Sequence, residues 1–246
     1  SVAGPPDFSV SGSAGGVMST PACSICESPS FMRAAKGPAL PFSEILKTPV
    51  IYGVFWGTFC YNYFVFFSLT WLPAYLVERR GMSKTDMGLI TGFSFGGMAT
   101  VAILAGALAD WLIVRGGNAV KVRKTFTVAG LLVASTEIIG AMSDSHTTAI
   151  AFAIVSLSGL GLATANYWAL TQTLMPGAAA GRIAGVQNMA SNLSGIVAPL
   201  LTGWLLQITG SYNAAMQAIV MFLLSGALAY VFLVKEKYAP GRRLAV

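Results

Sequence analysis

Residues 185–210 read GVQNMASNLSGIVAPLLTGWLLQITG, and this stretch decides how the chain is interpreted. It is long enough to cross a bilayer and carries no charge, which predicts a transmembrane helix. Asn188 and Asn192 lie four residues apart and therefore share one helix face. An adjacent face carries Gln187, Ser191 and Ser194. Because an unpaired amide in hydrocarbon is costly, this polar stripe faces either a wet cavity or another helix that it holds by hydrogen bonds.

The composition of the whole chain is that of an integral membrane protein. Of its 246 residues, 55% are hydrophobic and 10% are charged, and the mean hydropathy is +0.69. The net charge is +6. Because the basic residues lie in loops and ends, they indicate membrane topology and not a nucleic-acid partner. With His146 as its single histidine and no HExxH or GxSxG motif, the chain is not expected to be an enzyme.

The N-terminal residues 1–42 are rich in Ser, Gly, Ala and Pro, which predicts a flexible cytoplasmic tail or central loop. No basic segment precedes an apolar core, so no signal peptide is expected, and the chain could be a piece of a longer protein. Cys23 and Cys26 form an isolated CxxC, and Cys60 stands apart from them. Since no second pair accompanies the CxxC, neither a metal nor a cofactor is expected.

Long uncharged runs between short polar or charged links predict six transmembrane helices. The predicted spans lie within 48–77, 87–109, 126–142, 147–174, 183–206 and 214–234. They form a six-helix domain over residues 43–238, which begins with a short interfacial helix at 41–47 and is followed by a short basic cytoplasmic tail at 239–246. Six spans place both ends on one side, and 12 of the 15 Lys and Arg residues fall there. Both termini are therefore predicted to be cytoplasmic.

Particular residues within these spans predict packing or chemistry. Gly88, Gly92 and Gly96 recur every four residues, which predicts the close approach of a neighbouring backbone. Pro199 predicts a kink in the fifth span. Glu137 is an acid inside a predicted helix, and such a carboxylate takes part in coupling or substrate contact unless it reaches the membrane interface from the helix end.

The first span carries polar and aromatic side chains in its middle, and the fourth carries such side chains along one face. Tyr61 and Asn62 lie in the first span, and Trp168 shares a helix face with Thr164 and Thr171 in the fourth. These aromatic side chains either line a pocket or pack the helices together.

The link after the second span combines an acid with several cations. Asp110 is predicted to end the second helix, and basic residues precede the third. The carboxylate can pair with an arginine or with the N-terminus of the next helix at the membrane surface, or the segment is a plain cytoplasmic loop.

Three segments of the chain resemble one family of membrane proteins. They are FCYNYFVFFSLTWLPAYL at 59–76, GALADWLIVRGG at 106–117 and GVQNMASNLSGIVAPLLTGWLLQITGSY at 185–212. Together they resemble the C-terminal half of a major facilitator superfamily transporter, and more narrowly the anion:cation symporter family, which carries sugar acids and other organic anions. The resemblance covers about residues 41–236.

The resemblance implies an all-α membrane protein whose six transmembrane helices form one half of a major facilitator fold. It implies substrate-binding residues that face a central cavity, Tyr61, Asn62, Trp168, Asn188 and Asn192. It also implies a cytoplasmic gate loop, Gly106, Asp110 and Arg115. Glu137 would fall on a peripheral helix. The substrate-clamping arginine and the coupling carboxylates of the family lie mainly on helices that this chain lacks.

The function implied by the resemblance is transport of a small organic anion, a sugar acid of the hexuronate, glucarate or galactonate class, by proton- or sodium-coupled alternating access. The chain would be the C-terminal half of the carrier, in a bacterial inner membrane. Its partners would be the substrate, the co-transported ion, lipid, and either a missing N-terminal six-helix half or a second copy. The alternatives are a self-associating six-helix carrier or pore, and an inactive truncated fragment.

Overall fold

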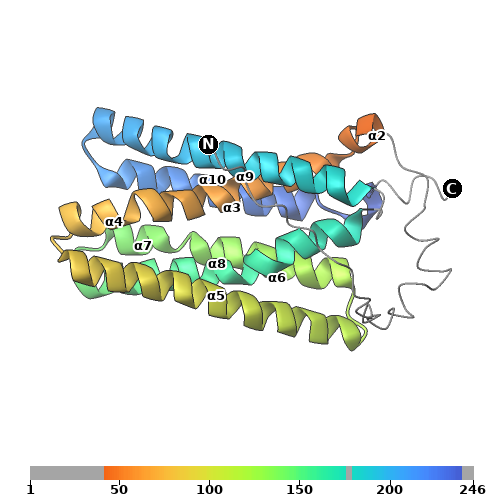
Figure 1. Ribbon diagram of the computed structural model, residues 1–246, viewed down its shortest axis with the longest axis horizontal. Helices are drawn as coiled ribbons and strands as arrows, with labels where there is room; N and C mark the ends of the chain where they lie inside the picture. The colour runs from red at the N-terminus through yellow and green to blue at the C-terminus, as the bar shows by residue number, and fades with distance from the viewer. Residues whose placement is uncertain (1–41, 176–178, 240–246) are drawn as a thin grey trace, which may run out of the picture. The chain divides into compact units, whose positions relative to one another are not determined.

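The computed structural model describes residues 42–175 and 179–239, and every regular element within these ranges is a helix (Figure 1). The short elements are α2 (Phe42–Leu46), α4 (Leu72–Ala74), α7 (Glu137–Met142), a π-helical turn η1 (Tyr75–Arg79) and a 3-10 turn η3 (Glu236–Tyr238). The long helices are α3 (Pro49–Thr70), α5 (Lys84–Val114), α6 (Ala119–Ala134), α8 (His146–Leu174), α9 (Ala180–Thr209) and α10 (Tyr212–Phe232). Most of each predicted terminal tail lies outside the described residues.

Six spans in this structure are long and apolar enough to cross a membrane, which confirms the predicted number. They are Pro49–Thr70, Lys84–Val114, Ala119–Met142, His146–Leu174, Gly181–Thr209 and Tyr212–Phe232. The second span is longer at both ends than predicted. It begins at Lys84 because Ser83 caps the helix, its Oγ accepting a hydrogen bond from the backbone N–H of Asp86 at 3.1 Å.

The helices pack as two groups around α3 and α8. Helix α3 packs against α9 and α10, α8 packs against α5 and α6, and α10 contacts α6 to join the groups. Helices α5 and α9 form opposite edges of the bundle in the view of Figure 1. Helix α3 is the most deeply buried of the six spans, and its Tyr63, Phe64 and Phe67 lie in the core.

The glycines that bring helices close together are not those of the predicted stripe. A Cβ added at Gly88, Gly92 or Gly96 would meet no atom within 4 Å, so that prediction is wrong within the described residues. A Cβ at Gly130 of α6 would instead lie 2.6 Å from the backbone nitrogen of Ala163 on α8. The stripe on α5 faces open space because α8 contacts a different side of that helix.

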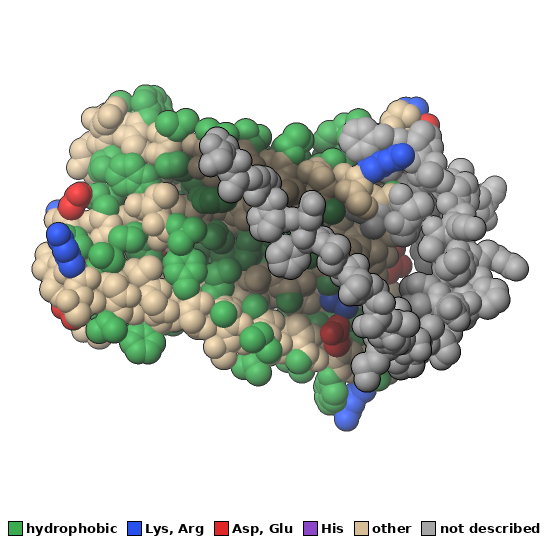
Figure 2. Space-filling view, viewed as in Figure 1, with side chains coloured by type: hydrophobic (Ala, Val, Ile, Leu, Met, Phe, Trp, Pro, Cys, Tyr) green, Lys and Arg blue, Asp and Glu red, His purple; other side chains and the backbone are tan. Residues whose placement is uncertain are grey.

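Charged side chains lie toward the two ends of the bundle on the face that Figure 2 shows, with hydrophobic side chains between them. Large apolar side chains are exposed along the middle of several helices, among them Phe93, Ile103, Leu200 and Met221. An apolar belt between two charged ends is the surface that a bilayer requires. The described residues therefore have the surface of a membrane domain.

Candidate functional site

Polar side chains meet inside the bundle where α3 approaches α8. The hydroxyl of Tyr61 lies 2.8 Å from Oγ1 of Thr164, and its ring centroid lies 4.7 Å from that of Tyr167. Tyr61 is buried, with 4% of its surface exposed. The structure therefore places this predicted residue in the interior, where it is held by α8.

Helix α9 joins the same region through a glutamine. Asn62 donates from Nδ2 to the carbonyl oxygen of Thr58 at 2.9 Å, one turn earlier on α3. Gln187, which is buried, donates from Nε2 to Oγ1 of the same Thr58 at 3.3 Å. These bonds link α3, α8 and α9 through a set of side chains that we call the polar junction, Thr58, Tyr61, Asn62, Thr164, Tyr167 and Gln187.

Trp168 lies beside the polar junction and lines a small cavity. Its ring centroid is 5.6 Å from that of Tyr167, and the side chain is half-buried. The cavity, of about 240 Å³, lies between α8 and α9. Its polar lining comes from Trp168, Thr171, Gln172 and Gln187. Amide, hydroxyl and indole groups in one cavity can orient a hydroxylated ligand by hydrogen bonds.

Asn188 and Asn192 lie on the open face of α9 and not in this cavity. Both are exposed, and Asn192 donates from Nδ2 to the backbone oxygen of Asn188 at 2.8 Å and to its Oδ1 at 3.4 Å. Among the described residues these two side chains make no hydrogen bond beyond these two. The structure thus places Tyr61 and Asn62 inside, Trp168 at a cavity and the two α9 asparagines outside. The substrate-binding role of all five stays a prediction.

Sequence reasoning missed two members of the polar junction, Thr58 and Tyr167. Tyr167 lies three residues after Thr164, so the helix face that carries Thr164 and Trp168 could have included it. Thr58 lies four residues before Asn62, a spacing at which a side chain commonly bonds back to the backbone. Both signals exist in the sequence but become specific only when the helices are packed.

The predicted gate residues do not form one loop. Gly106 and Asp110 lie within α5, which continues to Val114 because nothing before Gly116, with its φ of 97°, interrupts the helix. The prediction that Asp110 ends the helix is therefore wrong. Oδ1 of Asp110 accepts a hydrogen bond from the guanidinium of Arg123 on α6 at 2.9 Å, so the predicted pairing with an arginine is confirmed.

Arg115 takes no part in that ion pair. Its guanidinium carbon lies 3.8 Å from the ring centroid of Trp111, one turn earlier, which is a cation–π contact. Gly106 faces α8, where an added Cβ would lie 3.5 Å from the Cβ of Ala165 in ordinary contact. The role of these residues in gating stays a prediction.

Glu137 is buried inside the helix bundle, and its part in coupling or substrate contact stays a prediction. The helix breaks after α6, where Ser135 and Thr136 donate to the carbonyls of Leu132 and Val133 at 2.7 and 2.6 Å, and Glu137 begins α7. Its carboxylate accepts a hydrogen bond from the hydroxyl of Ser156 on α8. Within the described ranges no cluster of three or more His, Cys, Asp or Glu side chains could hold a metal ion.

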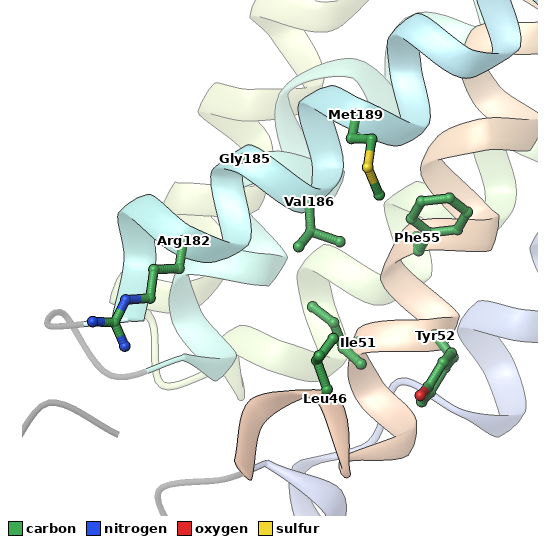
Figure 3. Close-up of a pocket in the computed structure, with 8 residues that line it drawn as sticks. All are labelled: Leu46, Ile51, Tyr52, Phe55, Arg182, Gly185, Val186 and Met189. Carbon is green, nitrogen blue, oxygen red and sulfur yellow. The ribbon is translucent and has the colours of Figure 1, made fainter. Parts of the chain in front are cut away.

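A second cavity, of about 530 Å³, lies between α2, α3 and α9 and is almost wholly apolar (Figure 3). Its wall includes Leu46, Phe55, Val186 and Met189, and the guanidinium of Arg182 extends away from these side chains in the view. None of the five predicted substrate-binding residues lines it. Because an apolar wall offers no partners for hydroxyl groups, the cavity beside the polar junction fits a sugar acid better despite its smaller volume.

Comparison with known proteins identifies the family. Residues 24–199 match the family model described as "Major Facilitator Superfamily". The "Probable galactarate/D-glucarate transporter GarP" of Escherichia coli (strain K12) is 32% identical over 82% of this chain and 46% of its own length. The "Hexuronate transporter" of Bacillus subtilis (strain 168) is 32% identical over 78% of this chain and 45% of its own. The "D-galactonate transporter" of Escherichia coli O6:H1 is 34% identical over 75% and 42%.

A solved structure supports the fold independently. A crystal structure of a mutant of the peptide transporter POT, in complex with sulfate, matches with a TM-score of 0.60 and 14% sequence identity. The match covers 85% of this chain and 41% of that one. This likeness concerns the fold alone. The chain spans less than half the length of the curated relatives described above.

Proposed function

Because the chain belongs to the major facilitator superfamily, we propose that it is the C-terminal half of a transporter that carries a sugar acid across a membrane. Its six membrane-capable helices make it a multi-pass integral membrane protein. The names of the relatives favour a substrate of the galactarate, glucarate, hexuronate or galactonate class. The chain covers less than half the length of each of these relatives, which favours a second six-helix half as its partner.

The observation that carries this proposal is the pair of exposed amides on α9. A membrane-facing asparagine would leave an amide unsatisfied in hydrocarbon, which is costly. In this proposal Asn188 and Asn192 therefore face a polar space, and Gln187, next to Asn188 on α9, belongs to the polar junction. A second half packed against this face would enclose that space, with Trp168 and the amides as partners for the hydroxyls of the substrate.

The counter-charge for the substrate carboxylate comes from the other half in this proposal. Neither α3 nor α8 contains a Lys or Arg residue, and α9 contains only Arg182, near its N-terminus. These helices supply neutral hydrogen-bonding groups and aromatic walls instead. The two halves rock against each other so that the cavity opens to one side at a time, and a proton or sodium ion moves with the substrate.

The proposed orientation places the basic end of the bundle in the cytoplasm of a bacterial cell, with the protein in its inner membrane. The excess of Lys and Arg decides which end of the bundle is cytoplasmic. In this orientation the cytoplasmic side carries both termini, the α5–α6 link and Arg182. The predicted gate then lies on the cytoplasmic side, where the ion pair between Asp110 and Arg123 ties α5 to α6.

Uptake of galactarate and glucarate by the complete protein, in cells that lack other carriers for them, tests the proposal. Asn188→Ala should lower the uptake rate at low substrate on the order of tenfold, since a hydrogen bond to a polar substrate group is lost. Met221→Ala, a change at an exposed apolar position on α10, should leave it unaltered. Normal membrane expression with unchanged uptake by Asn188→Ala would reject the assignment of this residue.

The second candidate is a self-associating carrier or pore made of copies of this chain. It is favoured by one observation, that α5 and α9 both present open faces within the described residues. Crosslinking of the 246-residue chain in a bilayer distinguishes the two. If crosslinking detects only monomers, this candidate is rejected. If it detects dimers, and these dimers take up sugar acid without any further chain, this candidate replaces the first proposal.

A further inference from the structure

A groove on the outside of the bundle lies apart from the polar junction, between α6 and α10. Its volume is about 500 Å³. Two lysines and a threonine stand at one end, and apolar side chains form the rest of its lining. The residues are Lys121, Lys124, Thr125, Val128, Ala129, Leu132 and Val231.

The basic end of this groove is built where α10 terminates. Nζ of Lys124 donates to the carbonyl oxygens of Val231 and Val234, at 2.8 and 3.0 Å. An ammonium group has three N–H donors, so one remains for a further acceptor. Lys235 directly follows Val234, and its ammonium lies 5.7 Å from the ring centroid of Phe232. Lys121, one turn before Lys124 on α6, is exposed. Lys121 and Lys124 therefore line one end of the groove, and Lys235 follows the residue whose carbonyl Lys124 binds.

The rest of the groove is apolar and continues an apolar surface. Leu132 lines the groove away from the lysines and is exposed, and Leu228 is exposed on α10 about one turn before Val231. Since these helices span the membrane, the apolar part lies in hydrocarbon and the lysines lie at the headgroup level. The groove thus matches an amphiphile with a negative head and a hydrocarbon tail.

We propose that the groove between α6 and α10 binds an anionic phospholipid. The phosphate lies among Lys121, Lys124 and Lys235, and one acyl chain runs along Val128, Leu132 and Val231. Basic pockets between transmembrane helices recognise lipid headgroups in this way. A lipid uses both parts of the groove, whereas a free anion would use only the lysines. The site concerns lipid and not transport, so it holds or fails independently of the proposed function.

Native mass spectrometry of the 246-residue chain in detergent micelles tests the site. Phosphatidylglycerol and phosphatidylcholine with identical acyl chains are compared as added lipids. Phosphatidylglycerol should bind more tightly, by on the order of tenfold, and inorganic phosphate in excess should not displace it. Equal binding of the two lipids overturns the proposal. Displacement by phosphate also overturns it, because the site would then recognise a free anion.

Variants locate the binding in the groove. Lys121→Gln combined with Lys235→Gln should remove most of the roughly tenfold preference for phosphatidylglycerol, because each lysine near the membrane surface attracts the anionic headgroup. Lys124 is left intact because its bonds to α10 support the fold. Ala129→Phe fills the groove and should weaken the binding of phosphatidylglycerol while the charges remain.

Lys84→Gln is the matched control, because it also removes one positive charge. Lys84 is the first residue of α5, at the end of that helix that lies away from α6 and the groove. This variant should leave the preference intact. A loss as large as that of the double lysine variant would show that net charge alone attracts the lipid, and would overturn the site. The site is also overturned if both Lys121→Gln/Lys235→Gln and Ala129→Phe bind phosphatidylglycerol as the unchanged chain does.

Discussion

Tyr61 is the residue at which α3 and α8 are joined by polar side chains. Its hydroxyl has one partner, Oγ1 of Thr164, and Thr164 also donates to the carbonyl oxygen of Leu160 at 3.3 Å. The ring packs on Tyr167, so the aromatic contact and the hydrogen bond can be separated by substitution. Tyr61→Phe removes only the bond, whereas the ring contact remains.

We expect Tyr61→Phe to lower the free energy of unfolding by about 1 kcal/mol, because a buried hydrogen bond is lost and Thr164 is left with one partner. Thr164→Val should cost about the same. The double variant should cost less than the sum, since both changes break one bond. Thermal unfolding in a fixed detergent measures all three. If the double variant loses as much free energy of unfolding as the two single variants together, Tyr61 and Thr164 do not share a hydrogen bond.

At the scale of helices, the contact of α6 with α8 depends on the absence of a side chain at Gly130. A Cβ there would lie 2.6 Å from the backbone nitrogen of Ala163 and 2.9 Å from its Cβ. A backbone atom cannot move aside as a side chain can. Gly130→Ala should therefore lower the free energy of unfolding by about 1–3 kcal/mol.

Gly88→Ala on α5 is the matched control, since nothing lies within 4 Å of the added Cβ. It should be neutral or stabilising by up to about 1 kcal/mol, because alanine favours the helix. Unfolding of the two variants in the same detergent compares them. Equal destabilisation would mean that α6 and α8 do not meet at Gly130.

These two glycines show how far the sequence determines the fold. The number of spans and their approximate bounds follow from uncharged apolar runs, because length and hydropathy alone select a membrane helix. Gly88 and Gly130 both occur in such runs, and nothing local to either states which one meets another helix. In the same way, helical spacing is enough to place Asn188 on a polar face, but the bond of Gln187 to Thr58 depends on where α9 packs on α3.

The orientation of the whole molecule can be tested with single cysteines. Asp144 follows α7, whereas Lys237 follows α10, whose C-terminal end lies beside the start of α6. The two positions are thus at opposite ends of the bundle. With Cys23 and Cys26 changed to serine and Cys60 left buried, each position is replaced by cysteine.

We expect a membrane-impermeant maleimide to label Asp144→Cys on intact cells and to label Lys237→Cys only after the membrane is opened. The physical reason is the excess of Lys and Arg at the end that carries Lys237. The reverse pattern of labelling would place the termini outside the cell. It would also move the predicted gate at Asp110 to the outer surface.

The open face of α5 belongs to a larger molecule if this chain is half of a transporter. A Cβ added at Gly92 would meet no atom of a neighbouring helix within 4 Å among the described residues, yet a row of glycines is the surface that lets a second helix come close. Gly92→Leu should leave the six-helix chain as stable as before or more stable by up to about 1 kcal/mol, because leucine favours the helix. In the complete protein it should reduce sugar-acid uptake roughly tenfold or more, because a leucine holds the halves apart. Ala151→Leu, at an exposed position on α8, controls for added bulk. Full uptake by Gly92→Leu would mean that this face of α5 meets lipid, and the second half would then have to pack against α9 alone.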